Sequence, residues 1–216
     1  MQTTSRIVST NQQGPHERLA EVVQKHLEHP DLSPLQSGSR AAYAQLVAVR
    51  EGRPLVIDAF CGTGQSTAQL AERHPGHLVV GIDQSAHRLG KHVPSTAGNY
   101  LLLQARCEDL WRLLAEDGQR VEHHYIFYPN PWPKSAQFKR RIHGHPGFSR
   151  LPVLGGRLEL RSNWRLYVEE FALAMLQAGH TGSVSPVPFE APAISLFEAK
   201  YRQSGHDLWR YEVNLS

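Results

Sequence analysis

The sequence predicts an α/β fold built on a doubly wound, mostly parallel β-sheet. Two observations lead to this prediction. Short apolar runs alternate with segments of helical periodicity, and the first strong apolar run leads directly into a glycine turn and a helix. Strands that alternate with helices indicate βαβ units and a parallel sheet. The 216 residues are enough for a full hydrophobic core.

The first fifty residues predict an arm and a helical cover. Residues 1–13 show no apolar periodicity, and we expect a mobile arm there. Four apolar residues recur at helical spacing within residues 16–28, which predicts an amphipathic helix, and a second helix is expected over residues 40–50. We therefore assign residues 1–50 to an N-terminal arm and helical cover.

The remainder, residues 51–216, is expected to form one Rossmann-like domain. Apolar runs bounded by Pro, Gly or Asp predict its strands, and periodic or capped segments between them predict its helices. The expected strands span residues 55–60, 77–82, 100–103, 125–128, 157–160, 183–187 and 207–214, and the expected helices span residues 67–74, 109–116, 163–177 and 195–203.

Composition limits the class of protein. There is no apolar run of about 18 residues, so we expect no membrane-spanning segment. The polar start lacks the apolar core of a signal peptide. The two cysteines, Cys61 and Cys107, exclude a disulfide framework and indicate a reducing compartment. We expect a cytoplasmic protein with no membrane partner.

Positive charge is concentrated in one stretch of the chain. The formal net charge is only +3, but residues 134–165 hold eight Lys or Arg and a single acid, Glu159. Such a local excess of positive charge is typical of a surface that binds a polyanion. The alternative is a solvated basic face without a partner.

A proline-rich loop is the most distinctive segment. Three prolines lie within residues 129–133, directly after the strand predicted over residues 125–128. Because each proline fixes φ and lacks a backbone donor, the loop is stiff. It holds Asn130 and Trp132 past the carboxyl end of a strand, where open α/β sheets bind ligands. Trp132 and Tyr128 are candidates for stacking on a base, although either could instead be core beneath the loop.

A glycine turn predicts a nucleotide-type site. Gly62 and Gly64 lie between a predicted strand and helix, and Asp83 ends the next strand 19 residues after Gly64. This pattern suits an adenosine cofactor whose ribose binds the acid. The third glycine of dinucleotide sites and the lysine of a P-loop are absent, and Asp58 would repel a pyrophosphate but suit a cationic ligand. S-adenosylmethionine fits best, with NAD(P) and structural coincidence as the alternatives.

The thirteen histidines do not predict a metal site. The closest pairs are His123-His124 and His143-x-His145, and neither has the helical spacing of a metalloprotease motif. Cys61 has no partner that would make it a nucleophile, so packing explains it better. We expect no metal.

With these residues in place, the chain resembles the bacterial tRNA (guanine-N7)-methyltransferase family. The similarity covers residues from about 55 to the C-terminus. The motifs that carry it are Phe127-Tyr128-Pro129-Asn130-Pro131-Trp132-Pro133-Lys134 with Lys139-Arg140-Arg141, Ser162-Asn163-Trp164 with Tyr167, and Ser195-Leu196-Phe197-Glu198 with Gly205-His206 and Trp209. The resemblance implies a seven-stranded sheet of the class I S-adenosylmethionine-dependent type. It also implies that the last two strands form an antiparallel pair at the sheet edge.

The resemblance further implies a set of site residues. Asn130 is the candidate catalytic residue. The candidate cofactor-binding residues are Asp58, Gly62, Gly64, Asp83, Gln84, Arg106 and Glu108, and the candidate substrate-binding residues are Trp132, Lys134, Lys139, Arg140, Arg141, Asn163, Ser195 and Glu198. Several of these depart from the family. Asn130 and Asn163 replace family aspartates, Asp58 replaces a glutamate, and Arg106 lies at or near the position of a family acid.

The function implied is an S-adenosylmethionine-dependent methyltransferase that modifies RNA, at guanine N7 of tRNA. Its partner would be tRNA or another structured RNA, and the choice between monomer and homodimer stays open. One alternative is a catalytically weak paralogue that binds RNA or another partner. Another is a methyltransferase for a small molecule or an exocyclic amine, since Asn130-Pro131-Trp132 also resembles the Asn-Pro-Pro-aromatic loop of amino-methyltransferases.

Overall fold

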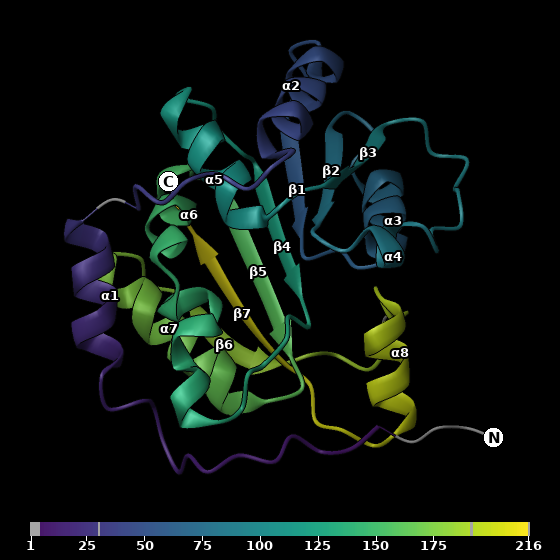
Figure 1. Ribbon diagram of the computed structural model, residues 1–216. Coiled ribbons are helices and arrows are strands. Elements are labelled where there is room, and N and C mark those ends of the chain that lie inside the picture. The colour runs from purple at the N-terminus through teal and green to yellow at the C-terminus, as the bar shows by residue number, and fades with distance from the viewer. Residues whose placement is uncertain (1–4, 30, 191, 216) are drawn as a thin grey trace.

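The computed structural model describes residues 5–29, 31–190 and 192–215, and within them it confirms the doubly wound α/β fold. Seven strands form one sheet in the order β3-β2-β1-β4-β5-β7-β6 (Figure 1). Their bounds are Leu55–Ala59 (β1), Leu78–Asp83 (β2), Tyr100–Gln104 (β3), His123–Phe127 (β4), Arg157–Ser162 (β5), Ser183–Pro186 (β6) and Trp209–Asn214 (β7). Strands β1 to β5 are parallel, whereas β7 is antiparallel to both β5 and β6. The expected antiparallel pair at the sheet edge is therefore confirmed.

The longer helices lie where the sequence predicts them, and several short ones were not expected. The α-helices are Leu19–Glu28 (α1), Ser39–Arg50 (α2), Gln65–Arg73 (α3), Ala86–Leu89 (α4), Cys107–Glu116 (α5), Arg150–Val153 (α6), Arg165–Gln177 (α7) and Leu196–Gln203 (α8). Three 3₁₀ turns, Ser135–Arg140, Ile142–Gly144 and Pro146–Ser149, follow the proline loop. The unexpected elements, α4, α6 and the 3₁₀ turns, are too short to show a periodic signal.

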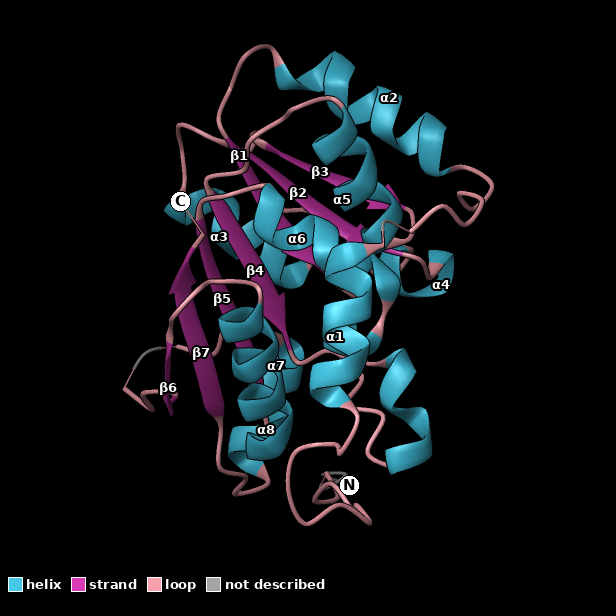
Figure 2. Cartoon of the chain, turned by 90° about the vertical axis from the view of Figure 1, so that its left-hand side faces the viewer, coloured by secondary structure: helices cyan, strands magenta, loops and turns pink. Residues whose placement is uncertain are grey.

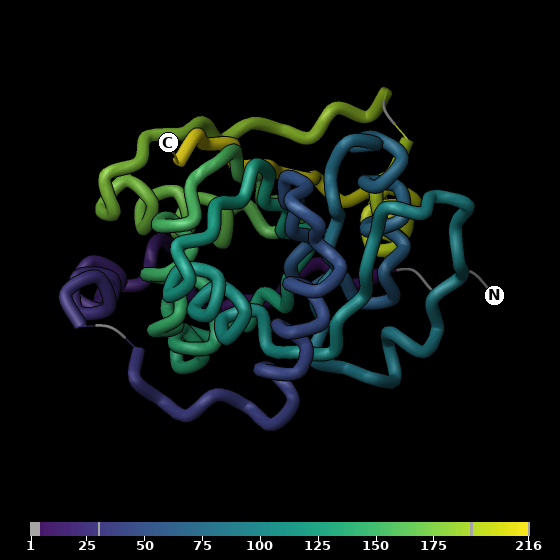
Figure 3. The backbone as a smooth tube through the Cα atoms, turned by 90° about the horizontal axis from the view of Figure 1, so that it is seen from above, coloured from purple at the N-terminus to yellow at the C-terminus, as the bar shows by residue number. Residues whose placement is uncertain are grey.

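Both faces of the sheet are buried, because successive side chains of a strand point to opposite sides. In β1, Leu55, Ile57 and Ala59 belong to the larger core cluster, whereas Val56 belongs to the smaller one. Helices α1, α2, α5 and α7 contribute to the larger cluster, on the face seen in Figure 2. Helix α3 contributes to the smaller one. Seen from above, α1 and α8 lie at opposite sides of the molecule (Figure 3).

The described part of the N-terminal segment contacts the rest of the chain. Residues 5–13 run beneath the sheet from α1 toward α8 (Figure 1). Thr10 Oγ1 donates to the Pro133 carbonyl at 2.7 Å, and Asn11 Oδ1 accepts from the Ser135 N–H at 2.9 Å. The Ser5 N–H donates to Ser204 Oγ at 2.9 Å. Hydrogen bonds leave no apolar periodicity in a sequence, so the sequence did not indicate these contacts.

The parallel strands bring their carboxyl ends to one edge of the sheet. Phe60, Asp83 and Ala105 follow or end β1, β2 and β3, and Tyr128 follows β4. The edge where the order reverses, between β1 and β4, is where such sheets bind ligands. None of the helices in the described part of the chain has the length and apolarity needed to cross a bilayer.

Candidate active site

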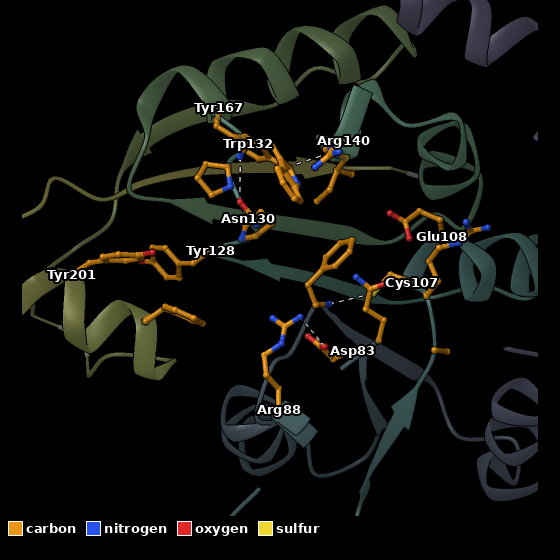
Figure 4. Close-up of a pocket in the computed structure, with 18 residues that line it drawn as sticks. Asp83, Arg88, Cys107, Glu108, Tyr128, Asn130, Trp132, Arg140, Tyr167 and Tyr201 are labelled. Atoms are coloured by element: carbon orange, nitrogen blue, oxygen red, sulfur yellow. Dashed lines mark hydrogen bonds and ion pairs between the residues drawn. The ribbon is translucent and has the colours of Figure 1, made fainter. Parts of the chain in front are cut away.

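A cavity of about 550 Å³ opens at this carboxyl edge. Asp83 and Arg88 line one side, and Asn130 and Trp132 line the side that faces them across the space (Figure 4). The other lining residues are Phe60, Gln84, Ala105, Arg106, Cys107, Glu108, Tyr128, Pro129, Pro131, Arg140, Ile142, Tyr167, Phe197 and Tyr201. The end of β2 and the proline loop, far apart in sequence, therefore line one cavity.

Asp83 is buried, and its carboxylate connects the end of β2 to the glycine turn. Its Oδ2 accepts from the Gly62 N–H at 3.0 Å, and its Oδ1 accepts from the Ser85 N–H at 2.8 Å. Arg88 Nη2 completes the set, 3.0 Å from Oδ1. A carboxylate offers about four acceptor sites, and the Arg88 side chain is 44% exposed. Arg88 can therefore turn away when a hydroxyl group needs the same oxygen.

The glycine turn borders a second, smaller cavity of about 260 Å³, which shares Phe60, Arg88 and Phe197 with the larger one. Gly62 has a φ of +63°, and a Cβ built on it would meet nothing within 4 Å. Free space thus lies directly beside the backbone. Gly64, with a φ of +74°, instead packs so closely that a Cβ would lie 2.7 Å from Leu102.

Asp58 lies behind the turn and does not line either cavity. Its Oδ2 accepts hydrogen bonds from Ser66 Oγ and Thr67 Oγ1, both at 2.7 Å. Its Oδ1 is buried and has no hydrogen-bond partner among the described residues. Burial raises the pKa of Asp58 to about 6, although the two hydroxyl donors oppose the shift. An orphaned carboxylate oxygen at this turn suits a positively charged ligand nearby.

Three residues around the larger cavity hold a backbone conformation that is costly for them. Phe60, Tyr128 and Trp132 have φ values of +62°, +53° and +44°, and all three line the cavity. Left-handed conformations cost non-glycine residues roughly 1–2 kcal/mol each. Strain of this kind persists only where the surroundings impose it, and it concentrates at functional sites.

Asn130 is exposed and turns the proline loop. Its Oδ1 accepts the Trp132 N–H at 3.3 Å, which supports the left-handed Trp132. The Arg140 guanidinium lies over the Trp132 ring, 4.8 Å from its centroid, at the wall of the cavity. An aromatic ring and a cation at the mouth suit a flat base joined to phosphate.

Arg141 is placed differently from the prediction. It is fully buried, so it cannot reach an RNA phosphate. Its guanidinium pairs with buried Glu170 and donates to the Trp132 carbonyl at 3.2 and 3.0 Å. The prediction of a phosphate contact is therefore corrected. Arg141 is a structural residue that holds the proline loop from below.

Glu198 also has a structural position. It is fully buried, and its Oε2 accepts from Tyr128 Oη and from Arg161 Nη1, both at 2.9 Å. Arg202 completes this cluster. The carboxylate therefore ties α8 to the end of β4, and the prediction that it binds substrate directly does not agree with this burial.

The other predicted residues divide between the cavities and the surface. Gln84, Arg106 and Glu108 line the larger cavity, although the Arg106 guanidinium is paired with Asp109. Ser195 caps α8 and lines the smaller cavity. Asn163 lies outside both and contacts His206 Nδ1 at 3.0 Å. Lys134 and Lys139 are exposed and lie outside the cavity walls.

Several lining residues were missed by the sequence reasoning. Arg88 belongs to a one-turn helix without a periodic signal, and Phe60 looked like the end of a strand. Phe197 and Tyr201 lie on one face of α8, which packs its Tyr201 ring against Tyr128 with centroids 5.4 Å apart. Only the i,i+4 spacing of the two aromatic residues could have indicated a shared face.

The fold and these paired walls define a class I methyltransferase of the Rossmann-like type. Comparison with known proteins supports this class. A family model described as putative methyltransferase matches residues 52–211. The chain therefore belongs to that family of putative methyltransferases.

Related proteins and solved structures agree with the family. A tRNA (guanine-N(7)-)-methyltransferase of Neisseria meningitidis is 27% identical over 172 residues, which cover 73% of this chain and 70% of that protein. One from Photorhabdus laumondii is 28% identical, with 72% and 70% covered. The structure of the 16S rRNA methyltransferase KamB aligns with a TM-score of 0.59 and 18% identity, covering 85% of this chain and 97% of that one. The last similarity supports the fold alone.

Proposed function

We propose that this protein transfers the methyl group of S-adenosylmethionine to N7 of a guanine in tRNA. The observation that carries the proposal is the single cavity in which the Asp83 side faces Asn130 and Trp132. A methyl donor held by one wall can then meet a base held by the other. The relatives named tRNA (guanine-N(7)-)-methyltransferase give the substrate class.

The residues of the first wall fit the cofactor. Asp83 offers acceptors for ribose hydroxyls beside Gln84, and Gly62 leaves space beside its backbone. The buried Asp58 carboxylate, with its unpartnered Oδ1, favours positive charge near the turn. When bound, the cofactor supplies an electrophilic methyl group on a positively charged sulfur.

The reaction requires the residues of the second wall only to position the guanine base. Guanine N7 has a lone pair and no proton, so no general base is needed: the N7–C bond forms as the S–C bond breaks, giving S-adenosylhomocysteine and a cationic 7-methylguanine. Trp132 would stack on the base, and Asn130 would face its polar edge. Lys134, Lys139 and Arg140 would bind phosphates, which fixes register rather than sequence. Cys61 and Cys107 are free thiols, which agrees with action in the cytoplasm.

The test is methylation of tRNA that lacks 7-methylguanine, with radiolabelled S-adenosylmethionine. We expect incorporation into tRNA, with cleavage at a 7-methylguanine after reduction and aniline treatment. If the methyl group maps to another atom, that atom and not guanine N7 is the target. If the protein binds S-adenosylhomocysteine and tRNA but incorporates no methyl group, it is the RNA-binding paralogue.

The variant Asn130→Asp sharpens this test. A carboxylate keeps the acceptor for the Trp132 N–H and adds a charged acceptor for the guanine edge, a gain of about 1–2 kcal/mol. We therefore expect kcat/KM for tRNA to rise roughly five- to thirtyfold, with an unchanged Kd for S-adenosylhomocysteine. A fall in kcat/KM would mean that the amide has a role that a carboxylate cannot take.

A further inference from the structure

Three histidines, two from the turn between α3 and β2 and one from the start of β4, meet at the edge of the sheet opposite the candidate active site. His74 follows the last residue of α3, His77 precedes β2, and His123 begins β4. One ring nitrogen from each can be chosen so that all three lie within 4.8 Å of one another. We propose that these histidines form a binding site for a divalent zinc ion.

The topology explains the cluster. β2 and β4 both pair with β1 and run parallel to it, so their amino ends lie on either side of the start of β1. Helix α3 connects β1 to β2 and returns His74 to the same end. The ring centroids of His74 and His123 lie 4.7 Å apart, and those of His74 and His77 lie 5.3 Å apart. His74 and His77 lie in the same short turn, and the fold adds His123 from β4, so the sequence spacing shows only two of the three ligands.

The two ring nitrogens of His77 have the environments found in a metal-binding histidine: one is hydrogen-bonded and the other is free. Its Nε2 lies 2.8 Å from Glu122 Oε2, whereas its Nδ1 is buried and lacks a hydrogen-bond partner among the described residues. A carboxylate that accepts from one ring nitrogen leaves the lone pair of the other free for a metal. The His74 ring is held in a similar way, with Nε2 2.9 Å from Tyr125 Oη.

The surroundings of the cluster also supply negative charge. The Glu122 carboxylate lies beside His77, with Oε2 2.8 Å from Nε2, so a cation bound by the three rings would have a carboxylate close to one of its ligands.

Zinc fits this donor set best. Three imidazoles and an open fourth position are a known arrangement for Zn²⁺, with Zn–N bonds of about 2.0–2.1 Å. Tetrahedral bonds of that length place the nitrogens about 3.3 Å apart, so the rings have to close from their present spacing by small side-chain rotations. The half-buried rings have room for this movement. An ion here would join α3, β2 and β4 at the amino edge of the sheet, without contact with the active-site cavity.

The experiment uses the full chain without a histidine tag, stripped of metal with EDTA and titrated with ZnCl₂ by calorimetry. We expect one ion per chain, with a Kd of about 1 μM or lower. His77→Gln and His123→Gln should weaken binding at least tenfold, and Glu122→Gln about tenfold. His87→Gln is the matched control, because His87 is exposed on α4, and its Kd should equal that of the unchanged chain.

A second measurement guards against variants that merely unfold. With Co²⁺ in place of Zn²⁺, the unchanged chain and His87→Gln should show the visible absorption of a tetrahedral nitrogen site. The His123→Gln variant should lack this absorption, while its circular dichroism spectrum stays that of the folded chain. No binding at micromolar zinc would overturn the proposal, as would binding that survives both histidine substitutions.

Discussion

The buried pair of Arg141 and Glu170 gives the sharpest test of how the proline loop is held. Both side chains are completely buried, and Arg141 also donates to the Trp132 carbonyl. Replacing Arg141 with Met leaves the Glu170 carboxylate without its cation, a change that typically costs 3–5 kcal/mol. Glu170 keeps donors from His143 at 3.0 Å and from the His16 N–H at 2.8 Å. We therefore expect a loss of about 3 kcal/mol.

Urea denaturation followed by tryptophan fluorescence measures this loss, since the chain has four tryptophans. The matched control is Arg140→Met, one residue earlier, where the exposed side chain stacks on Trp132. It should lower the free energy of unfolding by less than about 1 kcal/mol and reduce tRNA affinity instead. The double change Arg141→Met with Glu170→Leu should recover part of the stability, because no unpaired charge remains.

Two results would refute this reasoning. One is a loss below about 1 kcal/mol for Arg141→Met, the range of an exposed pair. The other is an equal loss for Arg140→Met. Either would show that the buried cation is not what fixes the loop.

Three further predictions follow from the same structure. Burial alone would raise the pKa of Glu170, but His143 and the Arg141 charge outweigh burial and lower the pKa from 4.5 to about 2. The ionised Glu170 therefore stabilises the fold above pH 4.5, and this stabilisation is lost as the pH falls toward 2. The urea midpoint should drop between these two pH values, and it should drop less in Glu170→Gln. Gly64→Ala should cost about 2 kcal/mol in thermal unfolding, because its φ is +74° and a Cβ would lie 2.7 Å from Leu102; Gly76→Ala, where a Cβ meets nothing within 4 Å and φ is not positive, is the control. Trp132→Ala should raise the KM for tRNA roughly fivefold to 150-fold through lost stacking while the Kd for S-adenosylhomocysteine stays unchanged, and an unchanged KM would remove Trp132 from the base site.

Much of the fold could be predicted because its signals are local. The apolar run at residues 55–60 and the prolines at residues 129–133 each determine backbone conformation without help from distant residues. The parallel topology then brings Asp83 and Asn130 to one edge, so the main features of the candidate site followed from strand order.

What could not be predicted depends on contacts between distant segments. Arg141 is one of three consecutive cations. The neighbouring residues in the sequence do not indicate that its partner is Glu170, 29 residues away. Glu198 looked like a substrate residue because of its motif, yet Tyr128 and Arg161 surround it. Asn163 likewise matches a motif but contacts His206. Of the three clustered histidines, His74 and His77 are close in sequence, but only the pairing of β4 with β1 brings His123 to them.

The attachment of the N-terminal segment has a consequence for how such enzymes diverge. Thr10 and Asn11 contact the proline loop through hydrogen bonds, and Ser5 contacts the end of α8, although none of the three lines the cavity. Changes in residues 5–13 can thus alter how firmly the proline loop is anchored while the cavity keeps every one of its lining side chains. Under the function proposed above, variation at this end of the chain would change how RNA is accepted without changing the walls of the cavity.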